Sequence, residues 1–238
     1  MALEKLWQHH YGELIDRPLN DFGRIIRGFR GEFPRMTREE FDREFSCSFD
    51  DSFNVMEQNM ARYSEEIRGH FANDKILCLS DTVDSILMWS YYAENHAGIV
   101  LRFTDETPGN PLRKARPVLY VDQIPSLFDD DMLSDMLAGY HAAGAQQIID
   151  KVVWTKSNLW AHEREWRVYS GRGRSDRQYE DIPFGVDELD GVIFGARMTD
   201  TDRASLVSLI KDRFPHVEVF HAKVRNDAYE LTIDTLKI

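Results

Sequence analysis

The residues best placed to do chemistry lie in the segment KSNLWAHEREWR (156–167). If EREWRVY forms a β-strand, alternation places Glu163, Glu165 and Arg167 on one face of it and Trp166 on the other. Two carboxylates on one strand face repel each other, so at least one must be paired or have a raised pKa. Arg167 is the expected ion-pair partner, and Trp166 is expected to turn toward the opposite, more buried side.

Spacing alone leaves two interpretations of this carboxylate cluster open. The side chains could form a structural ladder of ion pairs, or they could form an acid–base or cation-stabilising site in a cleft. Lys156 and Trp160 precede the two glutamates and could wall such a cleft.

A second concentration of aromatic and polar side chains lies in WSYYAENHAG (89–98). Tyrosine and tryptophan carry polar tips, so Tyr91 or Tyr92 could stack on a flat ring and hydrogen-bond its edge. Alternatively, Trp89 and Tyr92 anchor a hydrophobic core, and His96 lies at a helix end where the dipole favours a cation. The surroundings of His96 fit no standard metal site, and no metal is predicted.

The common catalytic motifs are missing from the sequence. It contains no Walker loop, no G-x-G-x-x-G, no G-x-S-x-G, no H-E-x-x-H and no C-x-x-C. This argues against ordinary NTPases, Rossmann dehydrogenases, lipase-like hydrolases and the simplest zinc enzymes. The glycines of GRGRSDRQ (171–178) lie in a polar stretch, which predicts a basic loop and not a phosphate cradle.

Composition limits the class of protein and its partners. The chain has 238 residues, 42% of them hydrophobic, so it can bury a core. Its formal net charge is -12, so it is not expected to bind nucleic acid in general. Cys47 and Cys78 cannot form a disulfide framework and predict a reducing compartment. No apolar run approaches the roughly 20 residues that span a bilayer, and the first residues lack a signal-peptide pattern. We therefore expect a cytoplasmic protein without a membrane partner.

Helices are predicted to dominate residues 1–70. Thr37 and Glu40 have the spacing of a capping box, and apolar residues at three- and four-residue steps predict a helix over 52–70. A further apolar stripe predicts one long helix over 129–154.

The rest of the chain mixes strands with helices. Asp81 is expected to begin a helix, centred on 85–96, that ends near Gly98, and DTDRASLVSLIKDRF predicts a helix over 200–214. Strands are predicted over 75–80, 98–103, 115–122, 164–170, 190–196, 217–224 and 228–233. Strands and helices do not alternate strictly, so we predict the α+β class: a single domain over 1–238 with a mixed sheet flanked by helices.

Two blocks of residues in combination resemble the uncharacterised bacterial family DUF2971. The first is LMWSYYAENHAGIVLRF, and the second is K-x-x-x-W-x-x-E-x-E-W-R, beginning at Lys156 and ending at Arg167. The closing VIFGARMTD, a helix and HAKVRNDAYELTI are also similar to that family, as is the divergent run DDSFN (50–54). The resemblance is predicted to cover residues 75–238.

The layout of that family resembles the ADP-ribosyltransferase superfamily. The resemblance implies an ADP-ribosyltransferase-like core with NAD as substrate, in which a late glutamate, Glu165 or Glu163, stabilises the cationic sugar as nicotinamide leaves. It further implies a nucleotide-binding set and a set of neighbouring pocket residues. The nucleotide-binding set is Tyr91, Tyr92, His10, Ser80 and Arg167. The neighbouring pocket residues are Lys156, Trp160 and His96.

Two functions follow as expectations. The first is an NAD-consuming transferase or glycohydrolase that acts on a macromolecule, in a toxin or phage-defence setting. The alternative is a non-enzymatic module that binds a ligand or a partner protein. A nuclease-like effector is disfavoured by the net charge and by the lack of a metal-ligand cluster.

Overall fold

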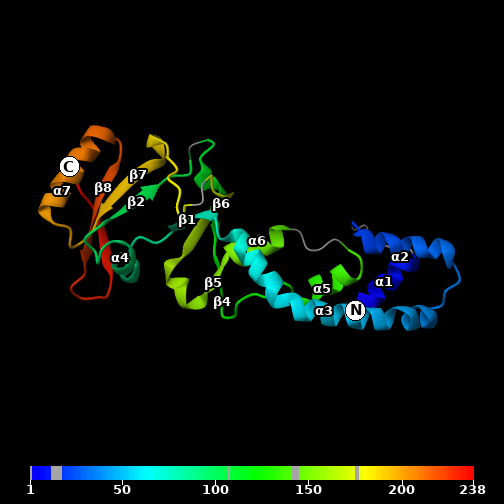
Figure 1. Ribbon diagram of the computed structural model, residues 1–238. Helices are drawn as coiled ribbons and strands as arrows, with labels where there is room; N and C mark the ends of the chain where they lie inside the picture. Colours follow the sequence, from blue (N-terminus) through cyan, green and yellow to red (C-terminus); the bar gives the residue numbers. More distant parts are fainter. Residues whose placement is uncertain (1, 12–17, 107, 141–144, 175–176) are drawn as a thin grey trace. The chain divides into compact units, whose positions relative to one another are not determined.

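The computed structural model describes residues 2–11, 18–106, 108–140, 145–174 and 177–238 (Figure 1). The chain divides into two compact units, and each is described by itself. Unit 1 comprises 1–72 and 124–155, and unit 2 comprises 73–123 and 156–238. The predicted α+β class is confirmed, whereas the organisation as one domain stays a prediction.

Unit 1 is helical, as predicted for the N-terminal third. Its helices are α1 (Ala2–Tyr11), α2 (Asp21–Glu32), α3 (Arg38–Phe71), α5 (Asp130–Leu137) and α6 (Ala145–Val153). Leu6, Ile26 and Phe41 form its buried core. The capping box that begins α3 is confirmed, because the Glu40 N–H donates to the Thr37 hydroxyl at 3.3 Å and the Thr37 N–H donates to the Glu40 carboxylate at 2.8 Å.

The single helix predicted over 129–154 is wrong. Helix α5 ends at Leu137, and Gly139 follows with a φ of +85°, a left-handed conformation that glycine adopts at helix ends. The chain becomes helical again at α6. The apolar periodicity continues on both sides of this interruption, so periodicity alone could not show it.

Unit 2 contains two open sheets. The three-stranded sheet has the order β1 (Asp74–Ser80), β6 (Glu165–Arg172), β3 (Arg116–Pro117). The four-stranded sheet has the order β2 (Ile99–Phe103), β7 (Leu189–Phe194), β8 (Glu218–Val224), β9 (Leu231–Thr235). A short ladder joins β4 (Leu119–Val121) to β5 (Thr155–Ser157), the segment where the chain enters unit 2.

Helices cover both faces of the four-stranded sheet (Figure 1). On one face, Ile210 of α7 (Asp200–Arg213) packs with Phe194 and Val219. On the other face, Trp89 of α4 (Ile86–Tyr92) packs with Ile193. Trp89 is 2% exposed, so its predicted burial is confirmed.

The predicted helix at 85–96 is shorter than expected. Ser85, and not Asp81, caps α4, because the Ser85 hydroxyl accepts from the Met88 N–H at 3.4 Å. After Tyr92 the chain leaves the helix, and Glu94, Asn95 and His96 all have positive φ. The remaining short elements of unit 2 are the 3₁₀ helices η1 (Pro111–Lys114), η2 (Asn158–Glu163) and η3 (Val186–Glu188).

No helix within the described ranges is both long enough and apolar enough to cross a membrane.

Candidate functional site

The structure brings four of the predicted residues together as a closed ion cluster. Lys156 donates from Nζ to Glu163 Oε2 and, at 2.9 Å, to Glu165 Oε2. Arg167 donates to the same Glu165 carboxylate, at 2.7 Å from Nε and at 3.1 Å from a terminal nitrogen. The predicted Glu–Arg ion pair is therefore confirmed, and two cations balance two carboxylates.

Both carboxylates of this cluster are buried, and the ion pairs shift the pKa values of Glu165 and Lys156. The side chain of Glu163 is 3% exposed and that of Glu165 is 6% exposed. Burial alone would raise the pKa of Glu165, but the hydrogen bonds from Arg167 and Lys156 outweigh it and hold the pKa at about 2. Burial would likewise lower the pKa of Lys156, but its bonds to both carboxylates raise the pKa above the usual value. Glu165 and Lys156 thus stay charged at neutral pH.

A kink, and not strand alternation, brings the two glutamates to one cation. Glu163 ends η2, and β6 begins only at Glu165. Arg164 between them has a φ of 47°, in the left-handed region, and its Nε pairs with Asp81 at 2.6 Å. Trp166 lies on the opposite face from Glu165, as predicted, together with Val168, which is 6% exposed, but Trp166 itself is only half-buried. The carboxylates can be buried deeper than the indole because cations neutralise them.

Polar groups from α4 and β1 also hold Glu163. The Tyr92 hydroxyl donates to Glu163 Oε1 at 2.8 Å, and this bond, helped by burial, raises the pKa of the Tyr92 phenol. The Ser80 hydroxyl donates to the Glu163 carbonyl oxygen at 2.7 Å. On the outer side, Lys156 Nζ lies 5.2 Å from the centre of the Trp160 ring.

Two further side chains that contact Glu165 were not predicted from the sequence. The Cys78 thiol hydrogen-bonds Glu165, and burial together with that carboxylate raises the pKa of the thiol to about 11. The Tyr120 hydroxyl accepts from the Glu165 N–H at 2.8 Å. Cys78 shares one strand face with Ser80, but only the pairing of β1 with β6 brings that face to Glu165. No local pattern in the sequence predicts these two contacts.

Three other predicted residues lie outside this cluster. Tyr91 is 62% exposed and contacts the ring of Tyr92 edge-on. His96 lies 3.0 Å from the Ser90 hydroxyl and stacks on Trp89. His10 belongs to unit 1, where it is 2% exposed among the aromatic rings of its core, and burial lowers its pKa. The roles of Tyr91 and His10 at a nucleotide and of His96 in a neighbouring pocket stay predictions.

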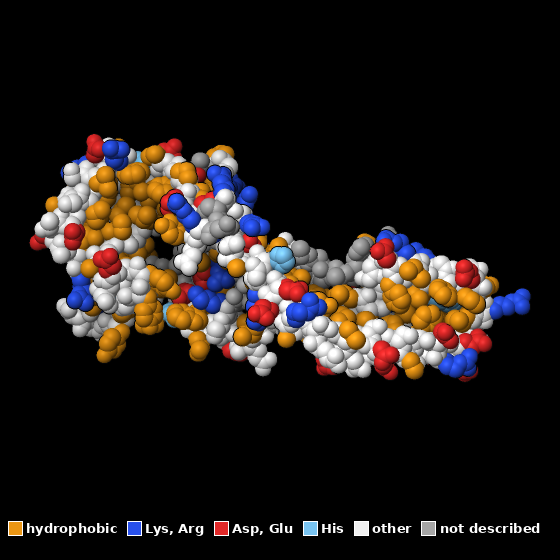
Figure 2. Space-filling model, in the orientation of Figure 1, with side chains coloured by type: hydrophobic (Ala, Val, Ile, Leu, Met, Phe, Trp, Pro, Cys, Tyr) orange, Lys and Arg blue, Asp and Glu red, His pale blue; other side chains and the backbone are white. Residues whose placement is uncertain are grey.

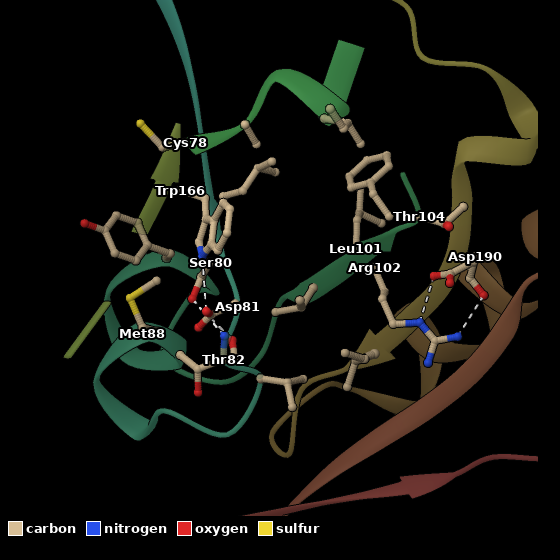
Figure 3. A pocket seen from close by; sticks show the side chains of 18 of the residues that line it. Cys78, Ser80, Asp81, Thr82, Met88, Leu101, Arg102, Thr104, Trp166 and Asp190 are labelled. Atoms are coloured by element: carbon tan, nitrogen blue, oxygen red, sulfur yellow. Dashed lines mark hydrogen bonds and ion pairs between the residues drawn. The ribbon is translucent and has the colours of Figure 1, made fainter. Parts of the chain in front are cut away.

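A cleft of about 950 Å³ lies beside this cluster within unit 2. Its two long walls are consecutive residues of β1 with the following loop (77–83) and of β2 with the following loop (99–106). Figure 3 shows Trp166 on the β1 side and Leu101 on the β2 side of the space between them. Figure 2 shows hydrophobic side chains beside the hollow in unit 2. The lining is mostly hydrophobic.

Three residues connect the ion cluster to the cleft. Cys78, Ser80 and Tyr92 contact the glutamates and also line the cleft, whereas neither Glu163 nor Glu165 does. The carboxylates therefore lie behind these three side chains. From there they can stiffen the wall of the cleft.

Three of the six charged side chains that line the cleft, those of Asp81, Arg102 and Asp190, take part in ion pairs. Arg102 donates to Asp190 at 2.7 Å, as Figure 3 shows, and to Glu218 at 2.6 Å. Asp81 accepts from the Trp166 indole at 3.1 Å in addition to its pairing with Arg164. No group of three or more histidines, cysteines or acidic residues in the described part of the chain could hold a metal ion.

Comparison with known proteins gives one match. No curated protein and no solved structure matches the chain. The matched segment is shorter than the predicted 75–238, but it includes the second sequence block and all of the first except Leu87. Residues 88–168 match the family model of DUF2971, described as a protein of unknown function, and the resemblance to that family is confirmed over this segment.

Proposed function

We propose that unit 2 is a binding module whose ligand occupies the cleft between β1 and β2. The observation that carries this proposal is the cleft itself, about 950 Å³ with a mostly hydrophobic lining. Sites for small ligands have volumes of roughly 300–1,000 Å³ and are apolar with a few polar groups. The ligand therefore places apolar groups against most of the lining.

The ion cluster supports binding over catalysis. A catalytic carboxylate must take up a proton or face a developing positive charge. Glu165 already accepts from Lys156 and Arg167, and Glu163 from Lys156 and Tyr92. Both are buried and neither lines the cleft. In this proposal the cluster fixes the cleft wall in shape.

Binding of the neutral apolar fluorophore Nile red tests the proposal. Leu77, on the cleft wall, and Leu209, on α7 outside the cleft, are each 50% exposed, which makes them a matched pair. We expect Leu77→Gln to weaken binding at least about fivefold and Leu209→Gln to leave it unchanged, since only the first removes apolar surface from the site. No binding, or equal binding by both variants, would overturn the proposal.

A second candidate is an NAD-consuming, ADP-ribosyltransferase-like enzyme acting on a macromolecule in a toxin or phage-defence setting. One observation favours it: Tyr92 lines the cleft and donates to Glu163 at 2.8 Å, so a small shift of Tyr92 would open Glu163 to a bound ligand. Glu163 would then stabilise the ribosyl cation as the bond to nicotinamide breaks, and water or an acceptor would attack it.

Nicotinamide release from NAD tests this second candidate. Glu163→Gln and Glu165→Gln keep the shape of each side chain and remove its charge. Glu188, 9% exposed and bonded to the Gly185 N–H at 2.9 Å, supplies a matched buried control in Glu188→Gln. The candidate predicts a loss of about 10²–10³-fold in one cluster variant only. Absence of release from the wild-type protein, with cell lysate as acceptor, would rule it out.

A further inference from the structure

Strand β1 is an edge strand whose residues 76–80 lack the usual protection. Within the described ranges it pairs with β6 alone, at the end of the three-stranded sheet. The run ILCLS (76–80) has no charged residue, and Ile76 and Leu77 are 40% and 50% exposed. Proteins normally protect such edges with lysine, proline or a bulge, because an exposed apolar edge pairs with other chains. A β-bulge occurs only before Ile76, between Lys75 and Ile76.

The hydrogen bonds of β6 show which main-chain groups of β1 face the cleft. Glu165 donates its N–H to the Tyr120 hydroxyl, and its carbonyl oxygen accepts from the Val118 N–H at 2.9 Å, so neither group is directed at Ser80 opposite it. In an antiparallel ladder, pairs that exchange hydrogen bonds alternate with pairs that do not. Ser80 and Cys78, two residues back, therefore direct their N–H and C=O away from β6.

The opposite wall is also an edge. Strand β2 ends the four-stranded sheet, and β7 is its one partner among the strands that the structure describes. Leu101 is 40% exposed and, with Phe103, lines the same cleft. An extended chain paired with β1 could rest alternate side chains on this apolar wall. The seven residues of β1 offer an edge of about 23 Å.

Charge indicates which extended chain fits. The lining includes four acidic residues, Asp81, Asp105, Glu106 and Asp190, but only two basic ones, Arg102 and Arg113. Arg102 pairs with Asp190, and Asp81 pairs with Arg164, which leaves Asp105 and Glu106 against Arg113. The cleft therefore favours basic over acidic side chains in an occupant.

We infer that the edge of β1 binds an extended peptide segment in which apolar residues alternate with basic ones. This inference rests on the proposed binding function and names the class of its ligand. The peptide adds a strand through the main-chain groups of Cys78 and Ser80, and its apolar side chains contact Leu101 and Phe103.

The test uses the full chain and a blocked heptapeptide of alternating valine and lysine. Binding is measured by calorimetry, together with two versions of the peptide that are N-methylated at residues 2, 4 and 6 or at residues 3, 5 and 7. Only one set of N–H groups can face β1, so we expect one version to lose at least about tenfold in affinity and the other to bind like the parent. A peptide of alternating valine and glutamate is expected to bind at least about tenfold more weakly.

Other results would overturn the inference. These are no peptide binding below about 1 mM, equal effects of both methylation patterns, or equal binding of the acidic peptide. A dimer of the protein that Leu77→Gln dissociates would assign the edge to a second copy of the chain. If Nile red binds in the cleft but no peptide does, the peptide inference fails and the binding module stands.

Discussion

Replacing Lys156 by methionine should destabilise the protein strongly, because it removes a cation that two buried carboxylates share. Lys156 Nζ donates to Glu163 and, at 2.9 Å, to Glu165. After the replacement, Glu165 keeps Arg167 at 2.7 and 3.1 Å, whereas Glu163 keeps only the neutral Tyr92 hydroxyl. The loss of stability therefore comes mainly from the unpaired charge of Glu163.

The magnitude follows from the burial of Glu163. Breaking a buried pair on one side costs about 3–5 kcal/mol, because the remaining charge is left uncompensated. Lys156 is 22% exposed, so water can partly replace it, and we expect the lower end, about 3 kcal/mol. If the unpaired charge of Glu163 is the cause, the double variant Lys156→Met with Glu163→Gln should recover to within about 1 kcal/mol of wild type.

Urea unfolding followed by circular dichroism measures these changes. Lys151→Met is the control: Lys151 pairs with Asp129 at 2.7 Å, but Asp129 is 53% exposed, so the loss should stay below about 1 kcal/mol. A Lys156→Met variant no less stable than this control, or a double variant no more stable than Lys156→Met alone, would show that Glu163 does not depend on Lys156 for its charge balance.

Three further predictions concern the same unit. The pKa of Glu165 is lowered from 4.5 to about 2, so its contribution to stability is complete above pH 4.5 and is lost as the pH falls toward 2. The free energy of unfolding in urea should therefore fall by about 2 kcal/mol between pH 6 and pH 3, and Glu165→Gln should lack this loss. With a pKa of about 11, the Cys78 thiol should react with iodoacetamide at pH 8 about tenfold more slowly than an ordinary thiol, because its lower thiolate fraction outweighs the higher nucleophilicity of its thiolate. Mass spectrometry measures the alkylation with Cys47 as internal reference, and equal rates at the two cysteines would contradict this prediction. Trp89→Ala should cost about 3–5 kcal/mol in urea unfolding, because the side chain is 2% exposed and its indole N–H donates to the Val83 carbonyl oxygen at 2.7 Å; a loss below about 1 kcal/mol would contradict its role in the core.

Local patterns predicted the elements of unit 2 well. Period-two alternation and apolar runs identified the strands now seen as β1, β2, β6, β7, β8 and β9, and the helix pattern identified α7. The same alternation predicted the Glu165–Arg167 pair, which depends only on neighbours two residues apart along one strand. Such features are encoded within a few residues, so a sequence can show them.

Features that depend on pairing between distant segments were not predictable. Cys78 and Tyr120 reach Glu165 only through the register of β1 against β6 and the approach of the 118–120 segment. The cleft needs two sheet edges to face each other, and no local pattern specifies which strands lie at edges. Helix α5 ends just before Gly139, which has a left-handed conformation that apolar periodicity does not register.

Residue-resolved amide hydrogen exchange along β1 tests whether the cleft binds an extended ligand through the edge of this strand. In the free protein, the Leu77 and Leu79 amides should exchange slowly, because they face β6, and those of Cys78 and Ser80 should exchange faster. Saturation with the valine–lysine heptapeptide is predicted to slow Cys78 and Ser80 at least about tenfold and to leave Leu77 and Leu79 unchanged. Unchanged exchange at Cys78 and Ser80, with the peptide bound, would contradict the account.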